Sequence, residues 1–429
     1  PPPPPPPPPH PHYLLQRPPP PHPTPQHSSA ASDVYKRQEN KPDTTLSLLE
    51  ALVPNACWLV TDDFPSRFHQ RRIDDVSRLA QVPVEKIDSN GILPLKAAKQ
   101  VYRRAFSFRR FMQSVLPEYF SSNPVATPLK RLLPATPFDL CSILEKRWVN
   151  GSDLNLVGRD TLGKLSIDYA VPPTSLRGGT KRASVLLSEF LESRLPDYSE
   201  TRNHPDRRST SELAPYLHHG HISTHEIFWK LMEKEGWNPA NVASGRSRGQ
   251  RSGWWGLSES AEAFLDQLIT WRELGFNMAW QFEGYDQYQS LPDWAKTTLE
   301  EHSTDLREHL YDFRQLENGE THDQLWNSAQ IQLVQEGTIH NYLRMLWGKK
   351  ILEWTRSPEE ALAIMIELNN KYALDGRDPN SYSGIFWILG RYDRPWGPER
   401  PIFGKVRYMS SENTARKVRL KNYLRRYGG

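Results

Sequence analysis

Residues 321–380 decide the fold of this chain, and they read THDQLWNSAQ at 321–330, IHNYLRMLWGKKILEW at 339–354 and LNNKYALDGRDPN at 368–380. Arg344 and Trp347 are three residues apart, so they share one face of a helix. Trp354 follows Trp347 by seven residues, which places it two turns farther along the same stripe. The spacing predicts a helix that is buried through its tryptophans and carries an arginine on the buried face.

Two interpretations of this stripe stay open on spacing alone. A row of tryptophans at helical spacing is more often core packing than a functional array, because large aromatic side chains supply buried area. The chain has 14 tryptophans, of which twelve fall between Trp229 and Trp396, so most of them must be core. A buried arginine needs a carboxylate partner, and Asp375 is the candidate partner for Arg344.

Residues 45–100 have the alternating pattern of an open parallel sheet. A short apolar run at 56–61 predicts a buried strand that ends at two aspartates, and an amphipathic helix follows from about Ser66 to Ala80. A second strand is expected near 82–88. A complete doubly wound domain usually starts with another strand–helix unit. We therefore expect a Rossmann-like α/β domain that is truncated, joined to an all-α domain.

The chain divides into four parts by composition. Sixteen of the first 26 residues are proline, so 1–38 is expected to be disordered and outside the fold. The partial α/β domain covers 39–120, a proline-punctuated linker 121–180, and the helical domain 181–429. Within the last part we expect a helix at 184–195, capping boxes that start helices at Ser223 and Ser357, and a flexible basic loop at 237–256.

Composition excludes several classes of protein. Hydrophobic residues make up 37% of the chain, and no run approaches the roughly 20 apolar residues that span a bilayer. No secretory signal is present, so we expect a cytoplasmic protein, associated with the nucleoid in a bacterium or the nucleus in a eukaryote. Cys57 and Cys141 are the only cysteines and cannot form a four-thiolate metal site. Residues 391–429 carry a net charge of +8, from eleven Lys/Arg and three acids, which suits a phosphate backbone or a solvated tail.

Two short motifs suggest ligand sites that their context does not support. His218, His219 and His221 lie in a loop before a helix without a spaced fourth ligand, so no metal site is expected. The glycines of the 249–253 segment lack the strand–turn–helix context of a phosphate loop.

These segments together closely resemble the class II cyclobutane-pyrimidine-dimer photolyases of the photolyase/cryptochrome family. The resemblance covers most of residues 56–420, and it includes SELAPYLHHGHIS at 211–223, FLDQLITWREL at 264–274, and SYSGIFW through FGKVRYM at 381–409. It implies an FAD enzyme, a deoxyribodipyrimidine photo-lyase, that uses light to repair ultraviolet lesions in DNA. A monomer without an obligate protein partner or membrane contact is expected.

The resemblance also assigns cofactor residues. Residues 210–214 begin a helix and would cradle the FAD pyrophosphate, because backbone amides at a helix start suit phosphate oxygens. Arg344 and Asp375 would form the ion pair beside the flavin ring, and Asn369 would face flavin N5, although an isolated Asn there also suits a helix C-cap. The cofactor residues implied are Tyr198, Thr210, Ser211, Glu212, Leu213, Ala214, Arg272, Asn341, Arg344, Asn369 and Asp375.

The remaining assignments concern electrons and DNA. Trp347, Trp326 and Trp354 match a chain that photoreduces FAD from the surface inward. Trp271 and Trp387 would flank a flipped-out dimer, with Met345 packing nearby and Arg407 supporting the gap left in the DNA. A lesion that stacks poorly costs less to extrude, so an aromatic pocket favours it.

Two positions depart from the pattern of the class. The family usually has a glutamate, which hydrogen-bonds the dimer, where this chain has Gln267; an amide has no charge and no transferable proton. Asp266 is adjacent, while Glu273 lies on another helical face. The truncated first domain also puts an antenna chromophore such as a deazaflavin in doubt. A cryptochrome-like photoreceptor and a flavin protein that has lost repair activity remain the alternatives.

Overall fold

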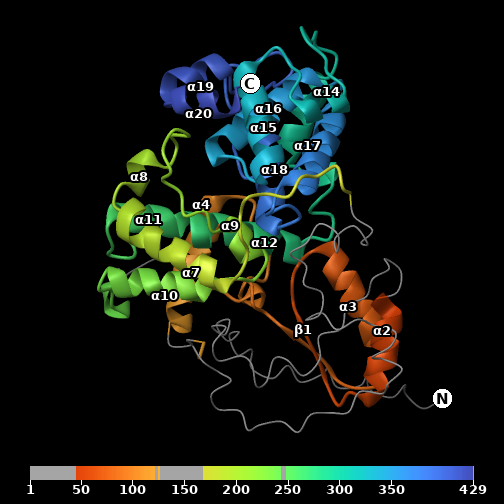
Figure 1. Ribbon diagram of the computed structural model, residues 1–429, viewed down its shortest axis with the longest axis vertical. Helices are drawn as coiled ribbons and strands as arrows, with labels where there is room; N and C mark the ends of the chain where they lie inside the picture. The colour runs from red at the N-terminus through yellow and green to blue at the C-terminus, as the bar shows by residue number, and fades with distance from the viewer. Residues whose placement is uncertain (1–44, 121–123, 126–167, 243–247, 429) are drawn as a thin grey trace, which may run out of the picture.

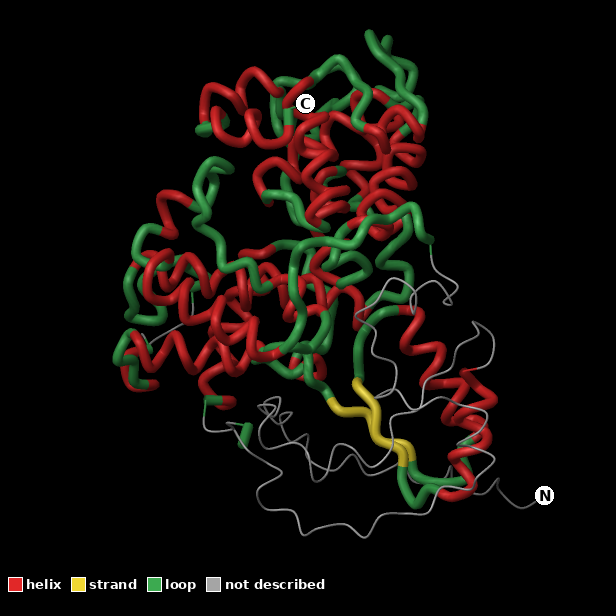
Figure 2. Tube along the Cα trace, in the orientation of Figure 1, coloured by secondary structure: helices red, strands yellow, loops and turns green. Residues whose placement is uncertain are grey.

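The computed structural model describes residues 45–120, 124–125, 168–242 and 248–428. The predicted proline-rich segment 1–38 and most of the predicted linker lie outside these residues. Figure 2 shows that the described chain consists of helices and the loops between them, apart from one pair of strands. The prediction of a small parallel α/β part followed by helices therefore agrees with the architecture.

The α/β part has the predicted strand–helix–strand order. Helix α2 (Thr45–Leu52) precedes strand β1 (Leu59–Asp62), helix α3 (Arg67–Leu79) and strand β2 (Val84–Ile87), and the two strands pair in parallel with Leu59 opposite Val84. The predicted strand began at 56, but the ladder starts only where Leu59 N–H donates to the carbonyl of Pro83. Ser66 caps α3, its Oγ accepting from His69 N–H.

Helices build the rest of the molecule (Figure 1). Two of them continue into π-helical turns, η5 (Phe190–Arg194) after α7 and η7 (Asp266–Trp271) after α11. The helices are α4 (Ala105–Val115), α7 (Thr180–Glu189), α8 (Tyr198–Thr201), α9 (Ala214–His218), α10 (Thr224–Lys234), α11 (Glu259–Leu265), α12 (Arg272–Gln281), α13 (Asp293–Glu301), α14 (Phe313–Asn318), α15 (Gln324–Glu336), α16 (Asn341–Trp354), α17 (Pro358–Tyr372), α18 (Pro379–Ile388), α19 (Ser411–Lys417) and α20 (Lys421–Tyr427).

Two hydrophobic cores meet where α12 packs along α18. One core joins residues 92–120 to the helices from α7 to α12, and the other joins α13 to α20, with Tyr382 packed against both. Gly275 of α12 allows the close approach, since a Cβ there would lie 2.9 Å from the carbonyl of Pro379 and 3.1 Å from Cα of Asn380. A side chain at 275 would separate the helices that join the cores.

A buried anchor fastens the α/β part to the helices. Arg272 donates from NH1 to the carbonyl of Asn90 (2.6 Å), and the Glu273 carboxylate accepts from the backbone N–H groups of Ile92 (2.7 Å) and Leu93 (3.2 Å). Burial raises the pKa of Glu273 to about 8. These two neighbouring side chains face the N-terminal segment, so they hold the parts together.

The prediction that 237–256 forms a flexible loop is wrong for its C-terminal end, residues 253–256. Trp254 and Trp255 are 2% and 5% exposed, and Trp237 donates its indole N–H to the carbonyl of Trp255 (2.8 Å). Glu262 accepts the N–H groups of Gly253 and Gly256. The glycine-rich composition suggested mobility, but two buried indoles and a carboxylate order this end.

Each predicted capping box forms only one of its two hydrogen bonds. Ser223 and Ser357 accept from the N–H groups of Glu226 and Glu360, as N-caps do. The reciprocal bonds are replaced, because Glu226 lies against Ser184 Oγ (3.4 Å) and Glu360 accepts from Arg356 N–H. The helix predicted at 184–195 begins earlier, as α7, and ends in the π-helical turn.

Lys349 is a buried amine in the second core. Its side chain is fully buried on α16 and donates from Nζ to the carbonyl of Ile388, at the end of α18. Burial lowers the pKa of Lys349 to about 7, partly offset by attraction to Asp393. Because the folded pKa is below the unfolded one, the folded state is penalised increasingly as pH falls from about 10.5 towards 7.

Replacement of Lys349 by methionine therefore should stabilise the protein more at pH 6 than at pH 9. The difference between the two pH values should be roughly 2 to 3 kcal/mol in the free energy of unfolding. Urea denaturation at both pH values measures it. Lys350→Met is the matched control, because that amine pairs with Glu353 at 2.7 Å. An equal effect of Lys349→Met at both pH values would contradict the buried, titrating amine.

Candidate active site

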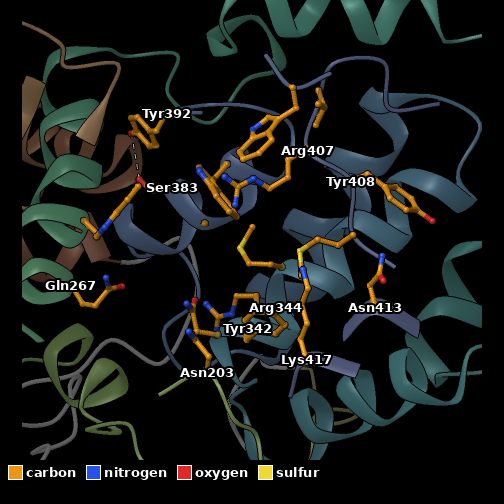
Figure 3. Close-up of a pocket in the computed structure, with 18 of the residues that line it drawn as sticks. Asn203, Gln267, Tyr342, Arg344, Ser383, Tyr392, Arg407, Tyr408, Asn413 and Lys417 are labelled. Carbon is orange, nitrogen blue, oxygen red and sulfur yellow. Dashed lines mark hydrogen bonds between the residues drawn. The ribbon is translucent and has the colours of Figure 1, made fainter. Parts of the chain in front are cut away.

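A cavity of about 780 Å³ opens beside the α12–α18 contact. Figure 3 shows side chains from several elements converging on it: the loop after α8, the π-helical turn η7, the start of α16, α18 and the segment 392–417. The volume is in the usual range for a ligand or cofactor site. Seven predicted site residues line it, namely Gln267, Trp271, Asn341, Arg344, Met345, Trp387 and Arg407.

The π-helical turn forms one wall. Its backbone bond runs from Arg272 N–H to the carbonyl of Gln267, five residues back. A wider turn of this kind often marks a functional site. It presents Asp266, Gln267 and Trp271 to the cavity together. Arg109 of α4 lies behind Asp266, donating from Nε to Oδ1 at 2.8 Å.

The first turn of α16 forms the floor. Arg344 lies 3.2 Å from Asp375 through NH2, so the predicted ion pair is present. The Nε of Arg344 is buried and has no hydrogen-bond partner among the described residues. Asn341 and Met345 flank it on the same helix. An unpaired buried donor at a cavity wall suits an acceptor on a bound ligand.

The opposite wall stacks cations on indoles. The guanidinium carbon of Arg407 lies 5.1 Å from the ring centroid of Trp387 and 4.2 Å from that of Trp396. Asp393 holds the group, with Oδ2 at 3.3 Å from Arg407 Nε and Oδ1 accepting the Trp396 indole N–H at 3.1 Å. Such contacts orient a planar cation.

The three predicted chain tryptophans are connected and buried. Trp326 donates its indole N–H to the carbonyl of Trp347 (2.9 Å), and its ring centroid lies 5.5 Å from that of Trp354. Gln330 accepts the indole N–H of Trp347 at 2.9 Å. The expectation that the outer member reaches the surface is wrong, since Trp354 is 2% exposed beneath Tyr311 and His322.

Asn369 lies within α17 and not at its cap, which is Ala373, so the alternative of a helix C-cap fails. Its Nδ2 donates to Ser381 Oγ at 2.8 Å, and the side chain is buried. Asp375 therefore lies behind Arg344, which lines the cavity, whereas Asn369 and its side-chain partners Ser381 and Asn370 do not line it. Their roles toward a cofactor remain predictions.

Other predicted cofactor residues do not line this cavity. Tyr198 packs against Phe190 and Phe264. Arg272 is turned to the α/β anchor because its NH1 binds Asn90. In the predicted pyrophosphate segment, which runs over Thr210, Ser211, Glu212, Leu213 and Ala214, Arg194 binds the carbonyl of Thr210 and pairs with Glu212. Because these residues do not line the cavity, the cavity does not support their assignment as cofactor contacts.

Several residues that line the cavity were not predicted from the sequence. A local sequence pattern could have indicated one of them, Trp396. Trp396 lies in the run YDRPW at 392–396, where an acid and an arginine sit beside aromatic residues, as a cation–aromatic stack requires. Arg202, Arg251 and Lys417 also line the cavity but are scattered through the sequence. Only folding brings these cations to the cavity.

Residues of the two discounted motifs bond to other parts of the protein. His218 Nδ1 lies 3.2 Å from Asp378, and within the described residues no group of three or more His, Cys, Asp or Glu is arranged to hold a metal ion. The Gly249 and Gly253 amides donate to Gln113 and Glu262. Among the described helices, none has the length and apolar character needed to cross a bilayer.

No family model matches the chain, but two known proteins that are similar to it in sequence share one name. The chain is 35% identical over 376 residues to the deoxyribodipyrimidine photo-lyase of Potorous tridactylus, covering 86% of this chain and 63% of that protein. It is 33% identical over 391 residues to the photo-lyase of Methanothermobacter thermautotrophicus, covering 90% of this chain and 78% of that protein. The chain thus spans less than two thirds of the first relative's length.

Solved structures show the same fold at low identity. A class III photolyase from Agrobacterium tumefaciens aligns with a TM-score of 0.61 at 17% identity, over 89% of this chain and 71% of that chain. A cryptochrome from Synechocystis aligns with a TM-score of 0.60 at 15% identity, over the same shares.

Proposed function

This chain belongs to the deoxyribodipyrimidine photo-lyase family, and from that premise we propose that it is a class II enzyme that splits cyclobutane pyrimidine dimers in DNA with light. The observation that carries the proposal is the cavity with Trp271 on one wall and Trp387 on another. Two indoles facing one space suit an extruded pair of bases, which can pack against the aromatic rings. A photoreceptor without repair activity needs no such walls, so the geometry favours repair over the cryptochrome alternative.

The charge around the cavity suits DNA. Among the described lining residues are five arginines and one lysine against a single carboxylate. Cations at the rim would neutralise phosphates on either side of a flipped lesion, so binding should weaken as salt rises. Arg407, held between Trp387 and Trp396, would occupy the space that the extruded dimer leaves in the duplex.

The cavity would also receive the flavin end of the FAD that the family implies, because Asn341 and Arg344 line it, whereas the predicted pyrophosphate residues 210–214 do not. The unpaired Nε of Arg344 offers a hydrogen bond to an acceptor on the flavin. Bound FAD in its reduced form would supply the light-excited electron donor, a chemistry that belongs to the cofactor. Arg344 would hold the ring beside Asp375, and a contact of Asn369 with the ring rests on the family resemblance alone. The proposed repair reaction needs no antenna chromophore, because reduced FAD itself absorbs the light.

The tryptophans would supply electrons for activation. Trp347 lies on α16 three residues after Arg344, and Trp326 and Trp354 follow it in an unbroken series of contacts. An electron can pass along this series toward the cavity. Since Trp354 is covered by Tyr311 and His322, an external reductant would meet those residues first.

Illumination of the purified protein with FAD and thymine-dimer DNA tests the proposed repair. We expect the absorbance of the thymine band to recover in the light and not in the dark. Protein that carries reduced FAD and still restores none of this absorbance would overturn the proposal.

Trp347→Phe should largely abolish photoreduction of FAD, because phenylalanine is much harder to oxidise than tryptophan and the series would lose its innermost member. Repair by protein that was reduced chemically should persist. Absorption spectra under illumination follow the first effect, and dimer repair follows the second. Trp294→Phe, an indole outside the series, is the control. Loss of both activities in Trp347→Phe would contradict the assigned role.

Gln267→Glu should raise the repair yield per absorbed photon. A carboxylate at this position accepts stronger hydrogen bonds than an amide, which would favour the bound dimer by up to about tenfold. The measurement is the repair yield per absorbed photon at DNA concentrations below saturation, where a larger bound fraction raises the yield. An unchanged or lower yield would show that the amide is no handicap here.

A further inference from the structure

We propose that Asp266 recognises the lesion, its outer carboxylate oxygen accepting the N3–H of one pyrimidine of the dimer. This inference rests on the proposed function and deepens it. Closure of the cyclobutane ring uses C5 and C6 of each base, so the N3–H donors of both thymines remain available. A pocket that binds the dimer needs an acceptor for them, because a buried donor without a partner costs free energy.

The backbone aims Asp266 at the cavity. In an α-helix, residues 266 and 271 would point in different directions, since five residues turn through about 500°. The π-helical turn is wider, so residues five apart come to the same side. Asp266 and Trp271 therefore share one wall, and the carboxylate lies beside the ring proposed to stack on the lesion.

Arg109 fixes which oxygen is free. Its Nε donates to Oδ1 of Asp266 at 2.8 Å, and its NH2 lies 2.7 Å from the same oxygen without being aligned to donate. Both side chains are largely buried, with 5% and 11% exposed. Within the described residues Oδ2 accepts no hydrogen bond and is not enclosed by protein, so it is the acceptor turned to the cavity.

Asp266 is also the single acid among the described lining residues. The cations at the cavity are Arg202, Arg251, Arg344, Arg400, Arg407 and Lys417. These donors suit phosphates and carbonyl oxygens, and none of them can accept a base N–H. Gln267 offers a neutral amide in the place of the usual glutamate. Asp266 is thus the strongest acceptor available for an N–H group, and it would carry the recognition that Gln267 provides only weakly.

The proposal predicts the effect of one methyl group on the DNA. Wild-type protein loaded with FAD is titrated in the dark with duplexes that contain a thymine dimer, either unmodified or methylated at N3 of the 5′ or the 3′ base. Methylation of one of the two bases should weaken binding about 10- to 100-fold, as the loss of a hydrogen bond to a charged group predicts. Equal affinity for all three duplexes would overturn the proposal. This test uses wild-type protein only.

Asp266→Asn supplies the second arm. Arg109 should hold the amide oxygen, which turns the NH2 group to the cavity and replaces the acceptor by a donor. The variant should lose a similar factor for the unmodified dimer and become insensitive to the methyl group, as two changes at one contact do. Asp293→Asn, with a side chain 97% exposed, is the matched control and should behave as wild type. If Gln267→Ala, and not Asp266→Asn, removes the methyl effect, Gln267 is the acceptor and the proposal fails.

Two further readouts separate the possible causes. The adenine amino group of FAD is another N–H donor, so flavin content is measured in each variant; loss of FAD from folded Asp266→Asn would assign the carboxylate to the cofactor and overturn the proposal. Light-driven repair by wild type is measured in parallel. Repair without any methyl effect would refute only the role of Asp266, whereas absence of repair would refute the function on which it rests.

Discussion

The close crossing of α12 and α18 is the constraint on which the site depends. Gly275 allows it, because a Cβ there would meet the backbone of Pro379 and Asn380. Trp271 lies one helical turn before Gly275, and Trp387 one turn after Ser383, which also faces the crossing. The same contact that joins the two hydrophobic cores thus sets the two indoles on one cavity. A wider crossing would leave both cores incomplete and move the indoles apart.

Charge placement follows from this arrangement. Buried charges in the scaffold are neutralised locally, as in the pairs of Arg109 with Asp266 and Arg344 with Asp375, because an unpaired buried charge is costly. Within the described residues, Arg202, Arg251, Arg400 and Lys417 line the cavity without forming an ion pair, so they are available to a ligand of opposite charge. A cavity with indole walls, paired charges and such cations is suited to a nucleic acid base that is drawn in while its phosphates stay outside.

The sequence predicts the parts of the site that local spacing determines. Arg344 with Trp347, and the succession of strand, helix and strand before residue 90, follow from periodicity, and the structure contains both. Spacing could not show that 266–271 is a π-helical turn, that Arg272 is drawn toward Asn90, or that Trp254 and Trp255 are buried. Those outcomes depend on contacts between separate segments, such as that of Arg272 with Asn90, or on a backbone register that composition does not encode. Spacing also could not show that Trp354 is buried, because its cover comes from Tyr311 and His322, which lie outside its own helix.

The central claim is that this cavity receives a dimer extruded from the duplex. The most direct measurement places 2-aminopurine opposite the lesion and follows its emission in the dark, since the probe brightens when its partner leaves the stack. The account predicts that emission rises on binding of dimer-containing DNA and stays low with Trp387→Ala protein at saturation. DNA that is fully bound by wild-type protein without any rise in emission would contradict the account.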